Sequence, residues 1–275
     1  MAVLFPAAPD LIAETDWLAE NLQNPKVRTV DMGWDGEFDR AHIPGAVRIP
    51  HPYIKGVENS RLVVTPEEAK SLFESLGIGD DSIVVGYDHN RIQGPARLWW
   101  VLTYYGHSNV KVLNGGWRKW VKEGRPIELT AAAAPSNVTF TPRPDPTVLA
   151  TVEELVSAIG QPGVGIWDAR TSDEFVGRPG GNARGGHVPG ATNLEWSEVV
   201  DPDEHTFKSL QEIQGLVSEV GLSPDQRTYA YCQAAVRGAH AALTLKLLGY
   251  PDVRLDDGSM GEWANREDTP LVEGS

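Results

Sequence analysis

The stretch from Arg227 to Gly238, RTYAYCQAAVRG, has a counterpart 144 residues earlier in the chain, from Ile83 to Gly94, IVVGYDHNRIQG. Both stretches begin with β-branched and aromatic residues, which are typical of a short buried strand. Both then continue through a loop to a glycine. The two stretches therefore predict the same strand and loop, but the strand ends at Asp88 in the first and at Cys232 in the second.

The same repeat extends to both sides of these stretches. Thr65 with Glu68, and Ser209 with Glu212, have the spacing of a capping box, which predicts that a helix begins at each place. Each half also has a glycine that ends a helix, an apolar helix, an acidic strand end, a His-x-Pro-Gly-Ala turn and a closing Trp. In the first half these are Gly77, 96–105, Asp31, 42–46 and Trp120, and in the second half Gly221, 239–248, Asp168, 187–191 and Trp263.

Strands and helices that alternate in each half predict an α/β fold, with a central parallel sheet flanked by helices. Ligand sites in such sheets lie at the carboxyl ends of the strands. The chain length agrees with two domains, which we expect at 1–130 and 148–275. Between them, 131–147 combines an Ala run with four prolines, which predicts an extended linker.

Composition excludes several classes of protein. A net charge of −14 argues against a general binder of nucleic acid or anionic membranes. No stretch approaches the roughly 18 apolar residues of a spanning helix, and the first ten residues lack the basic region of a signal peptide. One cysteine rules out an internal disulfide. A cytoplasmic, reducing setting is therefore expected.

Cys232 lies where a strand ends and a helix is about to begin. If the loop curls around the sulfur, its backbone N–H groups form an anion-binding nest, and the helix N-terminus adds positive potential. Arg237 adds a full charge. These effects favour the thiolate, which is the nucleophilic form, without an adjacent base. The loop residues expected to line the site are Gln233, Ala234, Ala235, Val236 and Gly238.

A lone cysteine at this place could also be structural, or it could belong to another class of enzyme. A single cysteine is commonly a buried, inert apolar residue, but a strand-to-helix edge followed by an arginine favours a reactive one. Cysteine phosphatases have five residues between Cys and Arg, whereas four residues separate Cys232 from Arg237. The tighter loop suits a sulfur atom carried on the cysteine better than a bound phosphate.

The order of these motifs, and its repetition, resembles the tandem-domain rhodanese family of thiosulfate and 3-mercaptopyruvate sulfurtransferases. The motifs are the two His-x-Pro-Gly-Ala turns, the Tyr-Cys-x₄-Arg loop and the ending Asp257-Gly-Ser-x-x-Glu-Trp263. The resemblance covers 11–263. It implies two rhodanese-like domains, of which only the second is active, and Asp88 in place of the nucleophile fits that asymmetry.

The resemblance also implies a ping-pong sulfurtransferase cycle. The Cys232 thiolate would take sulfur from thiosulfate or 3-mercaptopyruvate, sulfite or pyruvate would leave, and cyanide, a thiol or thioredoxin would accept the sulfur. No metal and no organic cofactor is implied. We lean towards thiosulfate, because Arg237 places charge close to the sulfur, and 3-mercaptopyruvate remains the alternative donor.

Related enzymes bind the anionic part of the substrate with arginines. The resemblance implies this role for Arg170, and for Arg178 and Arg184 in the Gly- and Arg-rich insertion of the second half. A surface ion pair or a solvated loop is the plainer alternative for each of them. Asp168 is expected to hold loops together and to help place Arg170.

Other residues are expected to have structural roles near the site. His187 recurs as His42 in the half without a nucleophile, which favours a His bonded to backbone in a tight turn. Asp257 and Ser259 are expected to border the pocket. At Ala235 the family often has Gly, so the loop is expected to adopt a conformation open to a residue with a Cβ.

Two functions of other classes stay open. A rhodanese-fold pair could bind a protein partner without turnover, since a fold can outlive its chemistry. A cysteine phosphatase or arsenate reductase is the third hypothesis, and the short loop argues against it.

Overall fold

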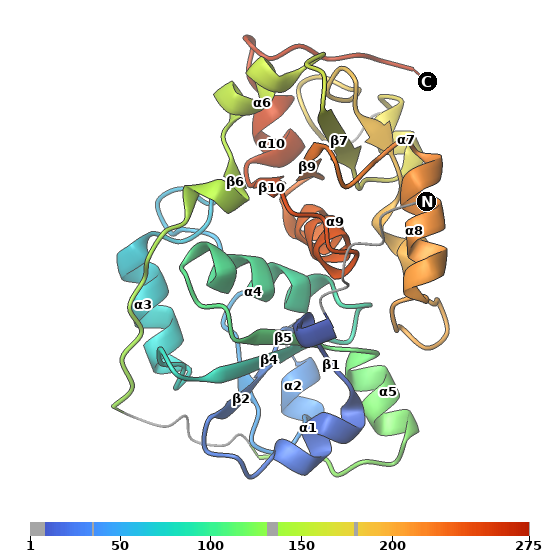
Figure 1. Ribbon diagram of the computed structural model, residues 1–275. Coiled ribbons are helices and arrows are strands. Elements are labelled where there is room, and N and C mark those ends of the chain that lie inside the picture. The colour runs from blue at the N-terminus through green and yellow to red at the C-terminus, as the bar shows by residue number, and fades with distance from the viewer. Residues whose placement is uncertain (1–8, 35, 131–136, 179–180, 275) are drawn as a thin grey trace. The chain divides into compact units, whose positions relative to one another are not determined.

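The computed structural model describes the chain at residues 9–34, 36–130, 137–178 and 181–274. The described chain forms two compact units (Figure 1). The first unit holds Pro9–Asp145 with the short segment Val200–Phe207, and the second holds the rest of the chain from Pro146 on. None of the helices in these described ranges has both the length and the apolar character needed to cross a membrane.

The first unit contains a five-stranded parallel sheet with the strand order β1-β5-β4-β2-β3. The strands are β1 (Ile12–Ala13), β2 (Val27–Asp31), β3 (Val47–Arg48), β4 (Ile83–Tyr87) and β5 (Val110–Leu113). The α-helices are α1 (Thr15–Asn21), α2 (Glu37–Arg40), α3 (Pro66–Ser75), α4 (Gln93–Tyr104) and α5 (Gly116–Lys122). Figure 1 shows α4 on one face of this sheet and α1, α2 and α5 on the other.

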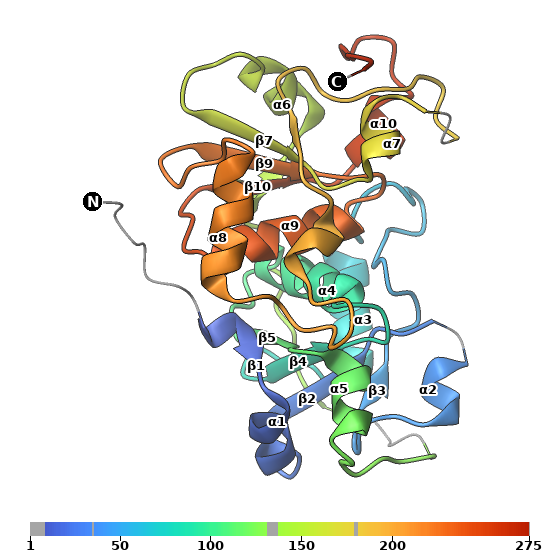
Figure 2. The same ribbon diagram turned by 90° about the vertical axis from the view of Figure 1, so that its right-hand side faces the viewer.

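The second unit repeats this architecture with the strand order β6-β10-β9-β7-β8. The strands are β6 (Leu149–Ala150), β7 (Val164–Asp168), β8 (Thr192–Asn193), β9 (Arg227–Tyr231) and β10 (Val253–Asp256). The α-helices are α6 (Val152–Ala158), α7 (Ser172–Phe175), α8 (Leu210–Glu219), α9 (Val236–Leu247) and α10 (Ser259–Trp263). Figure 2 shows α6 and α10 on one side of the sheet and α8 and α9 on the other. The predicted α/β fold with two parallel, helix-flanked sheets is confirmed.

The alternation of side chains along a strand explains why both faces of each sheet are covered. In β9, Tyr229 and Tyr231 point into an apolar cluster that also contains Leu155 of α6 and Trp263 of α10. Ala230 lies between them along the strand and is fully buried. The strand therefore has two buried faces, and it delivers the next residue, Cys232, to the carboxyl edge of the sheet.

The close approach of α9 to this sheet depends on a glycine. A Cβ on Gly238 would lie 2.8 Å from Leu255 Cδ1 and 3.2 Å from the backbone of Tyr231. A side chain there would therefore push the first turn of α9 away from β9. In the first unit, Gly94 fills the same place in the repeat, where a Cβ would lie 2.6 Å from Met32 Cβ.

The local helix signals in the sequence are confirmed. Thr65 with Glu68 and Ser209 with Glu212 form complete capping boxes at the starts of α3 and α8. The two apolar helices begin three residues earlier than predicted, at Gln93 for α4 and at Val236 for α9.

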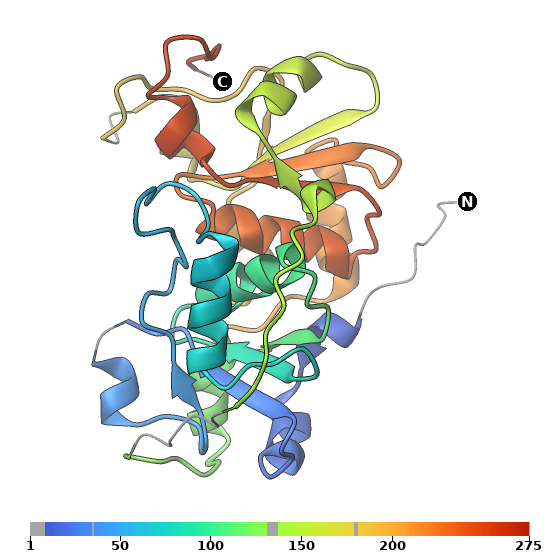
Figure 3. The ribbon, with the colours of Figure 1, turned by 90° about the vertical axis from the view of Figure 1, so that its left-hand side faces the viewer.

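The predicted linker 131–147 lies partly outside the described residues, at 131–136. Its described part follows the first unit: the ring of Phe140 is buried 4.8 Å from the ring of Phe73, and Phe140 N–H donates to Glu74 of α3 (3.1 Å). Figure 3 shows this yellow-green stretch running beside α3. The expected lack of a signal peptide concerns residues that are also mostly undescribed, 1–8.

Candidate active site

Cys232 follows the last residue of β9 and is fixed to the start of α10 through its backbone. Its N–H donates to Ser259 Oγ (3.1 Å), and its carbonyl accepts from Met260 N–H (3.0 Å). Ser259 Oγ in turn donates to the carbonyl of Asp256 (2.8 Å). The cysteine is 1% exposed, so its sulfur is almost completely shielded from solvent in this structure.

The loop turns into α9 at Ala235, which has φ +63°. The expectation that the loop would avoid the conformation of glycine at this position is wrong, because Ala235 lies in the left-handed region that glycine favours. The equivalent position of the first unit, Arg91, has φ +54°. The left-handed residue is therefore required by the path of the loop in both units, whichever side chain occupies it.

Ala235→Gly is expected to raise the free energy of unfolding of the second unit. A Cβ in the left-handed region costs about 1–2 kcal/mol of folded-state stability, which glycine recovers. Glycine also has more chain entropy to lose on folding, so the net gain is roughly 0.5–1 kcal/mol. Chemical denaturation measures it. The control is Ala234→Gly in the same loop, where φ is not positive and no gain is expected; a loss of stability in Ala235→Gly would contradict the argument.

The charge that faces Cys232 is the guanidinium of Arg237. Its Nη1 and Nη2 donate to the two carboxylate oxygens of Glu174, at 2.7 and 2.8 Å. Burial lowers the pKa of Arg237, but the hydrogen bonds and charge of Glu174, together with the sulfur of Cys232, outweigh burial and raise it. Arg237 thus lies between the cysteine and a carboxylate.

Glu174 is a residue that the sequence analysis did not identify. Burial raises the pKa of this carboxyl group, but the bonds and charge of Arg237 outweigh burial and bring it to about 2. Glu174 also closes a capping box with Thr171 at the start of α7. The Thr-x-x-Glu signature of that box was visible in the sequence, but it carried no sign that the carboxylate also reaches Arg237.

A pocket of about 190 Å³ lies beside the cysteine loop. Gln233, the residue after Cys232, lines it and exchanges two amide hydrogen bonds with Asn182, at 3.0 and 2.7 Å. The charged side chains that line it are Arg170, Glu174, Arg178 and Arg184. The pocket therefore brings together the predicted arginines, Gln233 and the unpredicted Glu174 and Asn182.

Arg170 and Arg178 are both paired with carboxylates. The Arg170 side chain is 3% exposed, and its Nε and Nη2 contact both oxygens of Asp168, with Nη2 at 2.6 Å. Nη2 also donates to the carbonyl of Gly186 (2.8 Å). Arg178 pairs with Asp173 at the exposed rim of the pocket. The charges of both arginines are thus neutralised in place.

Arg184 has a different environment. Its guanidinium donates to the carbonyl oxygens of Thr269, Trp263 and Arg266 and to the hydroxyl of Thr269. Among the described residues it makes no ion pair with a carboxylate. It therefore ties the insertion of the second half to the chain that follows α10, where the hydrogen bond from Arg266 and the charges of Arg266 and Arg184 lower the pKa of Asp268.

The remaining predicted residues lie around the loop. His187 donates through Nδ1–H to the carbonyl of Phe175 (2.9 Å) and stacks on its ring, as His42 does with Phe38. Asp257 is 1% exposed at the turn before α10. Val236 is buried in the first turn of α9, and Ala234 is half-buried in the loop.

The equivalent loop of the first unit surrounds an anion that belongs to the chain itself. The carboxylate of Asp88 accepts the backbone N–H groups of Asn90 (3.1 Å), Ile92 (3.0 Å) and Gly94 (3.0 Å). Burial raises the pKa of Asp88 to about 6, although these three bonds lower it. The loop that follows β4 thus directs its backbone amides at the negatively charged side chain of the residue that comes directly after the strand.

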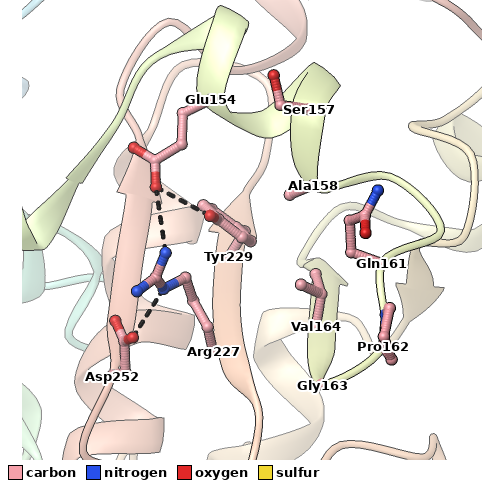
Figure 4. Close-up of a pocket in the computed structure, with 10 residues that line it drawn as sticks. All are labelled: Glu154, Ser157, Ala158, Gln161, Pro162, Gly163, Val164, Arg227, Tyr229 and Asp252. Carbon is pink, nitrogen blue, oxygen red and sulfur yellow. Dashed lines mark hydrogen bonds and ion pairs between the residues drawn. The ribbon is translucent and has the colours of Figure 1, made fainter.

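A larger pocket, of about 460 Å³, lies where β7 and β9 begin, at the opposite ends of these strands from Cys232 (Figure 4). Arg227 Nε pairs there with Asp252 (2.7 Å), and the hydroxyl of Tyr229 donates to Glu154 (2.9 Å). Ligand sites in parallel sheets lie at the carboxyl ends of the strands, so the smaller pocket is the candidate active site.

No group of three or more His, Cys, Asp or Glu side chains in the described chain is arranged to hold a metal ion.

The chain is similar to known proteins in both sequence and fold. A family model described as "Rhodanese-like domain" matches the chain twice, at residues 14–123 and 151–266. The sulfur carrier protein TtuD of Thermus thermophilus is 35% identical over 281 residues, which cover 98% of this chain and 98% of the relative. The thiosulfate sulfurtransferase of Azotobacter vinelandii is 33% identical and covers 97% of this chain and 98% of the relative. Among solved structures, SseA of Escherichia coli, a 3-mercaptopyruvate sulfotransferase, is 28% identical with a TM-score of 0.81, over 90% of this chain and 98% of that one.

Proposed function

Because this chain belongs to the family of proteins built from rhodanese-like domains, we propose that it is a sulfurtransferase that carries a sulfane sulfur on Cys232 as a persulfide. The observation that carries this proposal is the position of Cys232 at the carboxyl edge of the sheet, against the guanidinium of Arg237. The first unit supports it, because the equivalent loop there directs three amides at the carboxylate of Asp88.

In the proposed first half-reaction the Cys232 thiolate attacks the outer sulfur of thiosulfate. A new sulfur–sulfur bond forms at Cys232, the sulfur–sulfur bond of thiosulfate breaks, and sulfite leaves with the bonding electron pair. The loop amides and Arg237 stabilise the negative charge on the persulfide in the way that preorganised dipoles stabilise an oxyanion. Of the arginines that line the pocket, Arg184 makes no ion pair with a carboxylate among the described residues, so we expect it to contribute most to attracting the anionic donor.

In the second half-reaction a nucleophilic acceptor attacks the outer sulfur of the persulfide. Cyanide leaves as thiocyanate, or a thiol leaves as its own persulfide, and the Cys232 thiolate is restored. We propose a cellular thiol or a thioredoxin-like protein as acceptor, which agrees with the name of the Thermus relative, a sulfur carrier. 3-Mercaptopyruvate is the second candidate donor, favoured by the likeness to SseA.

Intact mass tests the proposal. Incubation with thiosulfate or 3-mercaptopyruvate is expected to add one sulfur, about 32 Da, and cyanide is expected to remove it with release of thiocyanate. Cys232→Ser should gain no mass, since an alkoxide does not form at neutral pH. No gain with either donor would overturn the proposal in favour of a binding module, and release of phosphate from an aryl phosphate would favour a phosphatase.

A further inference from the structure

The charges around the pocket are almost balanced. Four arginines lie in the pocket or against Cys232: Arg170, Arg178, Arg184 and Arg237. Three of them are paired with a carboxylate, those of Asp168, Asp173 and Glu174, and only Arg184 bonds carbonyl and hydroxyl oxygens instead. Arg184 is thus the one of the four without a carboxylate at ion-pair distance in the described chain, although, after the hydrogen bond from Arg266, its charge also lowers the pKa of Asp268.

Of the three carboxylates, Glu174 is the one that lines the pocket itself. Asp168 is fully buried behind Arg170, and Asp173 lies at the exposed rim, with 61% of its side chain exposed. Glu174 keeps 26% of its side chain exposed while it bonds Arg237. It thus places a negative charge next to the cation that faces the reacting sulfur.

We propose that Glu174 makes the pocket select between donors by their charge. Its carboxylate offsets the charge of Arg237, and this disfavours a dianionic donor relative to a monoanionic one. The inference rests on the proposed sulfurtransferase function and names the selectivity of its donor site. A dianion meets the charge of Glu174 with twice the repulsion of a monoanion. The charge of Glu174 therefore changes the ratio of kcat/KM for the two donors. A change in folding or loop packing lowers kcat/KM for both donors alike.

The test compares kcat/KM for thiosulfate, a dianion, with kcat/KM for 3-mercaptopyruvate, a monoanion, both with saturating cyanide at low ionic strength. Glu174→Gln is expected to shift the ratio towards thiosulfate by about 10- to 50-fold, the effect of one extra unit charge at roughly 7 Å and an effective dielectric constant of about 20–35. Raising the salt concentration should shrink the shift, because screening weakens it. Glu174→Ala, which also lacks the charge, should shift the ratio the same way.

Glu154→Gln is the matched control. Glu154 occupies the same third helical position of its own N-capped helix, α6, pairs with Arg254 (2.6 Å), and has a side chain 28% exposed, but it lies in the other pocket (Figure 4). In Glu154→Gln, the ratio of kcat/KM for the two donors should stay within about twofold of the parent protein, because the lost charge is far from Cys232. Glu174→Asp keeps the charge and should also keep the ratio.

The outcomes separate this inference from the proposed function. An unchanged ratio in the charge-free variants, or an equal shift in Glu154→Gln, overturns the role of Glu174 while persulfide formation stands. A shift above about fivefold in Glu174→Asp also overturns it, and this variant tests the inference even where the charge-free ones fail to fold. If neither donor loads Cys232 in the parent protein, the proposed function itself fails.

Discussion

Arg237→Gln is expected to slow sulfur transfer from thiosulfate to cyanide by about 10²–10³-fold, the loss seen when one preorganised donor to a developing anion is removed. Glutamine keeps a polar side chain of similar reach but has no charge to place against the sulfur of Cys232. The variant also leaves the carboxylate of Glu174 without its cationic partner beside the cysteine. Both changes raise the energy of a negative sulfur. Steady-state thiocyanate production and the alkylation rate of Cys232 by iodoacetamide at neutral pH measure the effect.

The matched control for this variant is Arg254→Gln. Arg254 is also held by a glutamate, Glu154, and its side chain is 17% exposed, compared with 20% for Arg237. The loss of an ion pair of similar burial is common to the two variants, and only Arg237 lies against the cysteine. Activity in Arg237→Gln within about threefold of the control would show that the guanidinium does not act on the sulfur.

Asp168→Asn is expected to destabilise the second unit by about 3–5 kcal/mol, because it leaves the guanidinium of Arg170 buried without a counter-charge. The burial of both partners decides this magnitude: their side chains are 3% and 0% exposed. Burial lowers the pKa of Arg170, but the bonds and charge of Asp168 outweigh burial and raise it, so the cation depends on this carboxylate. Urea denaturation followed by tryptophan fluorescence measures the change.

Asp252→Asn serves as the control for Asp168→Asn. Asp252 pairs with Arg227 at 2.7 Å, about as close as the buried pair, but both side chains are well exposed, at 37% and 44%. Exposed pairs contribute about 0–1 kcal/mol, since water and salt solvate both ions. Equal losses of stability in the two variants would show that burial does not set the strength of the Asp168–Arg170 pair.

The repeat made much of the fold predictable from the sequence. Capping boxes, strand-forming runs and glycine helix ends act within a few residues of chain, so their patterns at Thr65 and Ser209 predicted the starts of α3 and α8. The equivalence of Asp88 and Cys232 followed from the same offset. The left-handed conformation of Ala235 could not be predicted in this way, because it is decided by the path of the loop between β9 and α9 and not by the side chain of residue 235.

The arginines show where prediction from the sequence ends. The sequence identified Arg170, Arg178 and Arg184 as candidate anion-binding cations of the second half, but it did not identify their partners. Arg184 bonds carbonyl groups about 80 residues away, and Arg237 bonds Glu174, 63 residues away. Such contacts have no periodic signature in the chain.

By itself, then, the sequence determined two α/β domains, the position of the cysteine at a strand end and the presence of an aspartate, Asp88, at the equivalent place in the first domain. Only the tertiary structure decided which arginines near the cysteine are paired with a carboxylate. The reason is physical: strand and helix patterns come from interactions between near neighbours in the chain. The charge of the pocket depends on ångström-scale distances between side chains that folding alone brings together.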